Sequence, residues 1–252
     1  MKPTRSVPNR VPKPIGYRPI LNIDANAKTV KGQKQRYMTG VAYLAPSDSS
    51  GVMNVCPMAG LCKDPCLNTA GRGQFTKTQQ VRIEKTRLLF FDRELFIACL
   101  RYDIYRLIRQ ARKKRMRPCV RINGTSDLAW LALLFAAEFP TVPFYDYTKL
   151  EKPELRLRSN YHLTFSHDGP ANLAECLRVL LLGMNVSVVF ATPKGRPLPE
   201  TWHGHRVIDG DVNDLRFLDP SGVVVGLRAK GRAKKCTTAF VQPTDGLIQL
   251  AA

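Results

Sequence analysis

The sequence lacks the features that mark an exported or membrane-spanning protein. No apolar run approaches the roughly 18 residues of a membrane span. The longest such run, residues 129–137, fits a buried helix. The basic N-terminus is followed by no apolar segment, so we expect no signal peptide. These absences predict a soluble protein of a reducing, cytoplasmic compartment, with no membrane partner.

Acidic residues are scarce, since 20 Asp and Glu stand against 39 Lys and Arg, for a net charge of +19. The excess is concentrated, at +8 in residues 1–40, +7 in 101–117 and +5 in 228–235. Such clusters are typical of proteins that bind phosphates, because each neutralised phosphate releases counterions. We therefore expect nucleic acid as a partner. The alternatives are an acidic host protein and a basic face that serves only solubility. The candidate nucleic-acid-binding residues are Arg109, Arg112, Lys113, Lys114, Arg115, Arg232, Lys234 and Lys235.

Internal repeats and low-complexity tracts are also absent, and most of the chain has a strand–helix rhythm. A first strand is expected at 37–44, followed by a helical stretch at 76–116 with Asp92 as a candidate N-cap. Further strands are expected at 119–122, 143–147, 162–166, 186–191, 206–208 and 223–227, with helices at 127–139, 153–158 and 171–182. This alternation indicates an α/β fold with a parallel sheet.

Two architectures fit this rhythm equally well, an open doubly wound sheet and a full or partial (β/α) barrel. In both, ligands bind at the carboxyl ends of the strands. The first 40 residues hold five of the 18 prolines and no sustained period, which predicts an extended basic arm at 1–36. Residues 37–252 are expected to form a single barrel-like domain that carries a cysteine loop at 55–68.

Three cysteines, Cys56, Cys62 and Cys66, lie close together with the spacing C-x5-C-x3-C. Thiolates are soft ligands, and three can hold three irons of a [4Fe–4S] cluster or a zinc ion that takes a fourth ligand. Zinc sites favour closely spaced pairs, and no second pair or nearby histidine follows here. A cluster is therefore favoured, with zinc as the alternative. The other cysteines have no partner spacing and are expected to be small buried side chains: Cys99, Cys119, Cys176 and Cys236.

Polar side chains gather near the ends of the expected strands. Arg121 and Asn123 share one strand face, and a charged residue there needs an internal partner. That partner is either a ligand anion or a buried acid such as Asp146. The candidate catalytic residues are Arg121, Asn123, Asp146, Tyr147, Lys149, Ser166 and His167. The candidate cofactor-binding residues are Asn123, Thr125, Ser166, Arg228 and Lys230.

The position of the three cysteines, after a first strand and before strand–helix units, resembles the radical S-adenosylmethionine superfamily. The usual motif of that superfamily is C-x3-C-x2-C, from which this sequence departs. The resemblance implies a (β/α) barrel and a cluster whose open iron binds the methionine part of S-adenosylmethionine.

A second resemblance is carried by the blocks RPCVRINGTSDL, EFPTVPFYDYTKLEK and NYHLTFSHDG, which run in order after the cysteine loop. Between Val55 and Gly169, with a continuation through GLRAKGRAK, the sequence resembles the phage gene product 88 family. This resemblance implies a phage or prophage origin in a bacterial host cell, and a barrel-like fold.

Together these features predict a phage-type iron–sulfur protein, a radical S-adenosylmethionine-like enzyme that acts on nucleic acid or a nucleotide. The alternative is a non-catalytic nucleic-acid-binding phage protein whose cluster or zinc is structural. The sequence gives no indication of oligomeric state.

Overall fold

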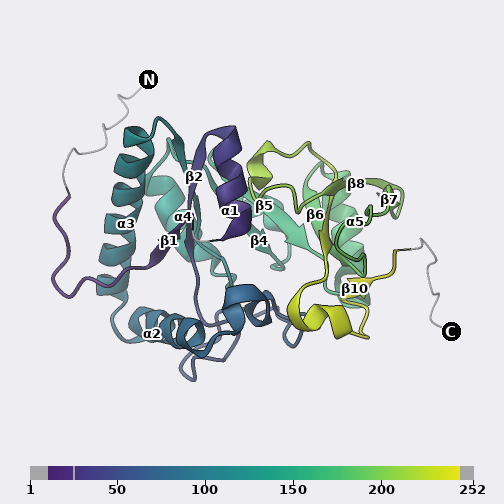
Figure 1. The fold of residues 1–252 in the computed structure, drawn as a ribbon, viewed down its shortest axis with the longest axis horizontal. Coiled ribbons are helices and arrows are strands. Elements are labelled where there is room, and N and C mark those ends of the chain that lie inside the picture. The colour runs from purple at the N-terminus through teal and green to yellow at the C-terminus, as the bar shows by residue number, and fades with distance from the viewer. Residues whose placement is uncertain (1–10, 25, 245–252) are drawn as a thin grey trace.

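The structure, a computed structural model, describes residues 11–24 and 26–244 (Figure 1). The strands are β1 (Leu21–Ile23), β2 (Tyr37–Ala42), β3 (Arg117–Arg121), β4 (Phe144–Thr148), β5 (Tyr161–Ser166), β6 (Asn185–Phe190), β7 (Thr201–Trp202), β8 (His205–Asp209), β9 (Val224–Arg228) and β10 (Val241–Gln242). The α-helices are α1 (Ala27–Lys31), α2 (Thr76–Phe91), α3 (Arg93–Lys113), α4 (Ala129–Glu138) and α5 (Leu173–Leu181). Short 3₁₀ helices are η1 (Gly32–Gln35), η2 (Leu67–Thr69), η3 (Gly71–Gln74), η4 (Pro153–Arg156), η5 (Pro170–Asn172), η6 (Arg216–Leu218) and η7 (Gly231–Lys235).

The strands form one sheet in the order β1-β2-β3-β4-β5-β6-β9-β8-β7. Strands β2 to β6, β9 and β8 are parallel, whereas β1 and β7 are antiparallel to their neighbours. Strand β5 pairs with β6 only as far as Ser187. Beyond that point, β10 pairs with Val189 and Phe190 of β6. The path from β1 to β7 does not close on itself. The expected α/β class is confirmed, while the barrel and its likeness to the radical S-adenosylmethionine fold stay predictions.

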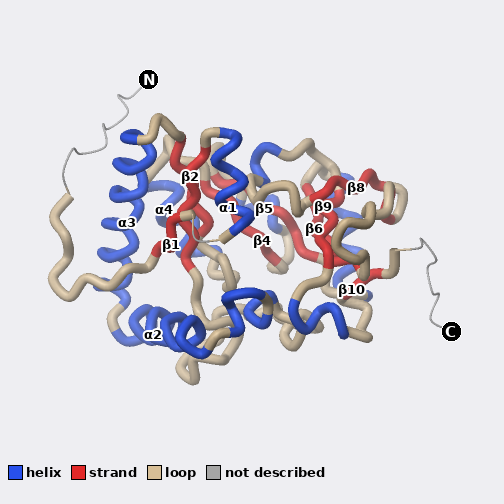
Figure 2. The backbone as a smooth tube through the Cα atoms, in the orientation of Figure 1, coloured by secondary structure: helices blue, strands red, loops and turns tan. Residues whose placement is uncertain are grey.

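The core lies between the sheet and the helices that connect its strands (Figure 2). The parallel strands β2 to β6 are added in chain order, each beside the one before it. Since such crossovers are right-handed as a rule, the connecting helices α3, α4 and α5 are expected on one face, and their buried residues do share one core cluster. Outward strand residues such as Val120, Phe144 and Phe165 are fully buried and pack with Ile104 and Phe135 of the helices. Because side chains alternate along a strand, the intervening polar residues point to the opposite face.

The helical stretch expected at 76–116 is two helices that meet at Asp92. The Asp92 side chain accepts a hydrogen bond from the Leu95 backbone amide at 3.0 Å, which caps α3 and confirms the expected N-cap. Helix α2 therefore turns away from α3 and lies below the lower end of the strands in Figure 1.

The predicted arm at 1–36 is not extended throughout its described part. Residues 21–23 form β1, and residues 27–35 form α1 and η1. The fully buried Asp103 of α3 accepts hydrogen bonds from the backbone amides of Ile20 (2.7 Å) and Leu21 (2.9 Å), which fixes β1 at the sheet edge. The first ten residues of the expected arm lie outside the described residues, as do residues 245–252 of the expected domain.

Within the described ranges, no helix has both the length and the apolar character that crossing a bilayer requires.

Candidate functional site

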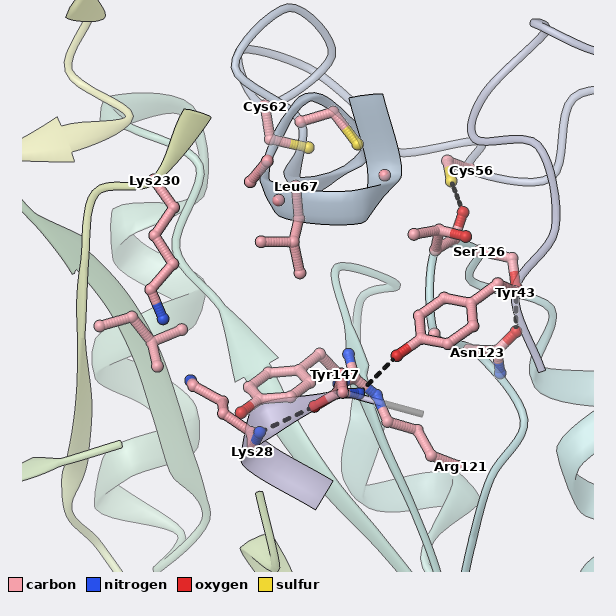
Figure 3. Close-up of a pocket in the computed structure, with 18 of the residues that line it drawn as sticks. Lys28, Tyr43, Cys56, Cys62, Leu67, Arg121, Asn123, Ser126, Tyr147 and Lys230 are labelled. Carbon is pink, nitrogen blue, oxygen red and sulfur yellow. Dashed lines mark hydrogen bonds between the residues drawn. The ribbon is translucent and has the colours of Figure 1, made fainter. Parts of the chain in front are cut away.

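A cavity of about 1220 Å³ lies at the carboxyl ends of the parallel strands. Its walls come from the cysteine loop, the residues that follow the strands, α1, α2 and the segment around η7. In Figure 3, Cys62 and Leu67 of the loop lie on one side, and Lys28 and Tyr147 lie on the opposite side. The fold thus brings segments from most of the chain to one space.

Most of the candidate residues expected from the sequence line this cavity. All three loop cysteines and all five candidate cofactor-binding residues do so. Of the candidate catalytic residues, only Asp146 is absent from the lining. The structure thus places these candidate residues in one cavity, while their catalytic and cofactor-binding roles stay predictions.

The cysteine loop is held over the strand ends by backbone hydrogen bonds. The carboxylate of Asp168, just beyond β5, accepts from the amides of Leu61 (3.0 Å) and Cys62 (2.8 Å). A Cβ atom at Gly60 would collide with this carboxylate, so the loop needs glycine at that position. At the start of the loop, Val55 is anchored through its carbonyl, which accepts from the Asp127 amide at 2.8 Å.

Each loop thiol makes its own polar contact with the protein. The Cys56 thiol donates to the Thr125 carbonyl at 3.4 Å, and Cys62 Sγ accepts from Lys149 Nζ at 2.9 Å. Burial raises the pKa of Cys56 to about 11 and also raises the pKa of Cys62. Both are therefore neutral thiols without a metal, and a metal would have to displace their protons.

The three thiols have the soft donor chemistry that iron or zinc takes, and they share one cavity. In the part of the chain that the structure describes, however, no three His, Cys, Asp or Glu side chains form a group arranged to hold a metal ion. The residues thus fit a soft metal group by chemistry and by common placement, although they do not converge on a single ion.

The remaining cysteines behave largely as expected. Cys99, Cys119 and Cys176 are fully buried, whereas Cys236 is only half-buried. The prediction that Cys236 is buried is therefore wrong. Cys236 follows η7 and does not lie in a strand or helix that faces the core.

Arg121 finds an acid partner inside the protein, but that partner is Asp214 and not Asp146. Its guanidinium lies 3.1 Å from Asp214 and stacks over the Tyr147 ring at 4.6 Å. The same carboxylate accepts from the Tyr145 hydroxyl at 3.3 Å. Burial lowers the pKa of Arg121, but attraction to Asp214, together with smaller contributions from neighbouring tyrosines, leaves the pKa above its ordinary value. The structural ion pair thus occupies the inner sheet face.

Asn123 and Asp146 form a closed hydrogen-bond set. Asp146 accepts from the Asn123 backbone amide (2.7 Å) and side-chain amide (3.1 Å). The Asn123 carbonyl oxygen in turn accepts from Ser126 Oγ (2.8 Å) and the Leu128 amide (2.9 Å). These bonds shape the β3–α4 connection, so both candidates have a structural task.

Lys149, Ser166 and His167 lie together beneath the loop. Lys149 Nζ, besides its contact with Cys62, is 3.9 Å from Asp168, and Ser166 Oγ is 3.0 Å from Ser187 Oγ. His167 is buried edge-on against Trp202, and burial lowers its pKa to about 4. Its Nδ1 is enclosed and has no hydrogen-bond partner among the described residues.

Two of the candidate cofactor-binding residues are already neutralised by carboxylates. Arg228 lies 2.9 Å from Asp209 and 3.4 Å from Asp211, and Lys230 lies 2.7 Å from Asp211. A third cation, Lys28, also pairs with Asp211 at 2.9 Å. Sequence reasoning missed these partners, because Asp209 ends β8 and Asp211 lies in the turn that follows, and the local sequence indicates only ordinary Asp-Gly turn chemistry.

Two cavity cations were missed by sequence reasoning altogether. Arg82 and Lys85 of α2 line the cavity and are buried. Their spacing of three places them on one side of the helix, which could have signalled a shared environment.

The candidate nucleic-acid-binding residues divide into two exposed clusters. Arg109 and residues 112–115 lie at the end of α3, which leads directly into β3 and so stands at the amino ends of the parallel strands. Arg232, Lys234 and Lys235 lie in η7 on the cavity side, where the Arg232 amide donates to Thr69 at 3.2 Å. The two clusters therefore stand at opposite ends of the sheet.

A family model described as Gene product 88 matches residues 20–242 of the chain. The matched range runs from the residue before β1 to the last residue of β10, and it includes the cysteine loop and the whole cavity lining. No curated protein and no solved structure matches the chain.

Proposed function

The chain belongs to the gene product 88 family of phage proteins, and we propose that it is an iron–sulfur protein. In the finer proposal it is a radical S-adenosylmethionine-like enzyme that acts on nucleic acid or a nucleotide. The observation that carries the proposal is that Cys56, Cys62 and Cys66 all line one cavity with the strand ends. Cysteines that only filled space would be enclosed in the core, as Cys119 and Cys176 are.

An iron–sulfur cluster agrees better with the loop than zinc does. A zinc ion draws each thiolate to about 2.3 Å, so its ligands converge on one point. The described residues hold no such convergent group. A four-iron cluster binds each cysteine through a different iron, so its ligands surround a larger body. The spacing C-x5-C-x3-C, which lacks the closely spaced cysteine pairs of zinc sites, supports a [4Fe–4S] cluster on Cys56, Cys62 and Cys66.

The strand order supports a partial (β/α) barrel as the finer description of the fold. A doubly wound sheet reverses its strand order at a switch point, whereas a barrel adds each strand beside the previous one. Here β2, β3, β4, β5 and β6 follow one another without reversal. A cofactor would then bind at the carboxyl ends of these strands, where the cavity lies.

Several side chains of the cavity have tasks in this proposal. When bound, a cluster with an open iron would supply one-electron chemistry to S-adenosylmethionine. Lys149, which donates to Cys62 Sγ, would orient that ligand and offset the negative charge of the sulfur. The hydroxyls of Thr125 and Ser166 stand at strand ends, where they would orient the cofactor. The loop above them would limit the access of water.

An anionic substrate is favoured by the charge of the cavity lining. Nine cationic residues line it against three carboxylates, Asp24, Asp127 and Asp214. Phosphates are the anions that an intracellular polymer or nucleotide brings in number. The proposal therefore takes nucleic acid or a nucleotide as the substrate class.

The test is purification without oxygen, followed by iron and sulfide analysis and an absorption spectrum. We expect about four irons and four sulfides per chain in the wild-type protein, and loss of both in a variant with all three loop cysteines changed to alanine. Cys236→Ala is the matched control, because this cysteine is half-buried but does not line the cavity.

A colourless wild-type protein with neither iron nor sulfide would overturn the cluster. If zinc were found in place of iron, the cluster would be rejected and the cysteines would be assigned to a structural zinc site. With a cluster in hand, titration with S-adenosylmethionine tests the finer proposal, because a cofactor on the open iron changes the electron paramagnetic resonance spectrum of the reduced cluster.

A second candidate function rests on the basic end of α3. Arg112, Lys113, Lys114 and Arg115 are exposed there, at the end of the sheet opposite the cavity. A nucleic acid bound only at this end would lie away from the cysteine loop, which stands at the carboxyl ends of the strands. The alternative is therefore a non-catalytic nucleic-acid-binding protein in which the metal only fixes the loop, and its binding would survive loss of the loop cysteines.

A further inference from the structure

Helix α2 places two cations inside the cavity wall. Arg82 and Lys85 have 9% and 8% of their surface exposed, and both line the cavity. Removing an ammonium or guanidinium group from water costs several kcal/mol unless charge partners and hydrogen bonds replace the water. The partners of these two side chains therefore decide whether the pair is structural or functional.

The partners found are neutral. Lys85 Nζ donates to the Ile20 carbonyl at 2.8 Å and to Asn22 Oδ1 at 3.0 Å. The Arg82 guanidinium donates to Asn68 and lies over the Tyr43 ring at 4.9 Å. Among the residues that the structure describes, no carboxylate lies within 4.0 Å of either cation, and the enclosed Nε of Arg82 has no acceptor.

The other buried or half-buried cations of the cavity are paired. Their carboxylate partners lie within 4.0 Å: Lys28, Arg228 and Lys230 with Asp211, Arg121 with Asp214, and Lys149 with Asp168. The buried cavity cations that form no ion pair among the described residues, Arg82 and Lys85, therefore lie on the α2 side, where the buried Asp103 attracts Lys85 only from beyond ion-pair distance. Because Asn68 follows Cys66 by two residues, this side adjoins the cysteine loop.

We propose that Arg82 and Lys85 form the binding site for a phosphate group of a nucleotide or nucleic-acid strand. This inference deepens the substrate class of the proposed function and rests on it. A phosphate monoester, as in a nucleotide, carries about −1.5 to −2 charges at neutral pH and can neutralise both cations, whereas a carboxylate or an internal phosphodiester of a strand carries one negative charge and neutralises one. A phosphate oxygen also offers the acceptor that the Arg82 guanidinium lacks.

The acid–base state of the pair agrees with this assignment. Burial lowers the pKa of Lys85 to about 8, so the ammonium group is still charged at neutral pH. Burial also lowers the pKa of Arg82. A bound dianion would oppose both effects, because it favours the charged form of each side chain.

The test is calorimetric titration of the anaerobically purified protein, at low ionic strength, with three probes: adenosine, adenosine 5′-monophosphate and a short single-stranded oligonucleotide. At least one phosphate-bearing probe is expected to bind about tenfold or more tightly than adenosine. Which of the two binds identifies the source of the phosphate. Equal affinity for all three probes, or no binding of either phosphate compound, would overturn the inference. This result needs only the wild-type protein.

Variants then locate the site. Arg82→Gln and Lys85→Met are each expected to lower the affinity for the phosphate-bearing probe about tenfold, because each removes a charge-assisted contact. Arg87→Gln is the matched control, since Arg87 lies on the same helix, is exposed and does not line the cavity. Unchanged affinity in both folded test variants, or an equal loss in the control, would contradict the assignment.

Iron content measured on the same samples separates this inference from the proposed function. Phosphate binding in a protein without iron would overturn the cluster and leave the phosphate site standing. A protein that contains iron but does not bind phosphate would overturn the phosphate site and leave the cluster standing.

Discussion

Asp168 holds the cysteine loop at Cys62, because its Oδ1 accepts a hydrogen bond from the Cys62 backbone amide at 2.8 Å. The second carboxylate oxygen accepts from the neighbouring Leu61 amide at 3.0 Å. A residue at the end of β5 thus positions a loop that lies more than 100 positions earlier in the sequence. If the loop cysteines hold a cluster, Asp168 is a positioning residue for it.

Asp168→Ala is therefore expected to loosen the loop and speed the loss of a cluster in air about tenfold, in line with other residues that orient metal ligands. The decay of visible absorption after exposure to air measures this rate. Asp168→Asn retains one acceptor oxygen and should fall between the alanine variant and the wild type. Asp48→Asn is the control, because Asp48 forms only an exposed ion pair with Lys63 of the same loop. Equal decay in Asp168→Ala and wild type would show that the loop does not depend on this carboxylate.

The ion pair of Arg121 and Asp214 is expected to make a large contribution to stability. Asp214→Asn leaves the Arg121 guanidinium buried without a counter-charge, which should lower the free energy of unfolding by about 3–5 kcal/mol. Urea denaturation measures this change. The double variant Arg121→Met, Asp214→Leu removes both charges and should recover part of the loss. If the losses of the single variants Arg121→Met and Asp214→Leu added up to the loss of the double variant, direct pairing of the side chains would be contradicted.

His167 is expected to make stability depend on pH in the acid range. Its folded-state pKa lies near 4, against 6.5 for a free histidine, because burial and the nearby charges of His203 and Lys149 disfavour the imidazolium form. Between these values the unfolded chain binds more protons than the folded one. The free energy of unfolding should therefore rise by as much as about 3 kcal/mol from pH 4 to 6.5 and be fully present above 6.5.

Denaturation of wild type and His167→Gln across this range measures the effect, since the variant lacks the titrating group. The wild-type curve should be steeper between pH 4 and 6.5, and the two curves should be parallel above that range. Parallel curves throughout would place the folded pKa of His167 near its ordinary value.

Local patterns predicted the parallel strands well, because apolar and polar residues alternate within each strand and so identify its two faces. In β4 and β5 the alternation separates Phe144 and Phe165, which pack on the helices, from Tyr147 and Ser166, which line the cavity. The edge strand β1 was missed for the opposite reason. It has three residues in a proline-rich segment, and it is fixed by Asp103, about 80 positions away.

The candidate site was only partly predictable for a related reason. The cysteine spacing marked the loop by itself, since closely spaced cysteines outside a disulfide framework are more often metal-binding or catalytic. Asp214, in contrast, lies 93 positions from Arg121, and nothing near either residue indicates the pairing. Arg82 and Lys85 were missed because they lie among other charged residues of α2, such as Glu84 and Arg87, so that two buried cations resemble a solvated face until the loop that covers them is placed.

The two basic clusters at opposite ends of the sheet allow a comparison that separates the two proposed functions. Each phosphate contact contributes about 0.9 to the slope of log affinity against log salt concentration on double-stranded DNA, and about 0.7 on a single strand. If nucleic acid enters the cavity, neutralising Arg232, Lys234 and Lys235 together should lower this slope by up to about 2 on a single strand. Neutralising residues 112–114 at the end of α3, an equal number of exposed cations, should then change the slope little. The reverse result would place the strand at the far end of the sheet, where it cannot contact the cysteine loop, and would favour the non-catalytic binder.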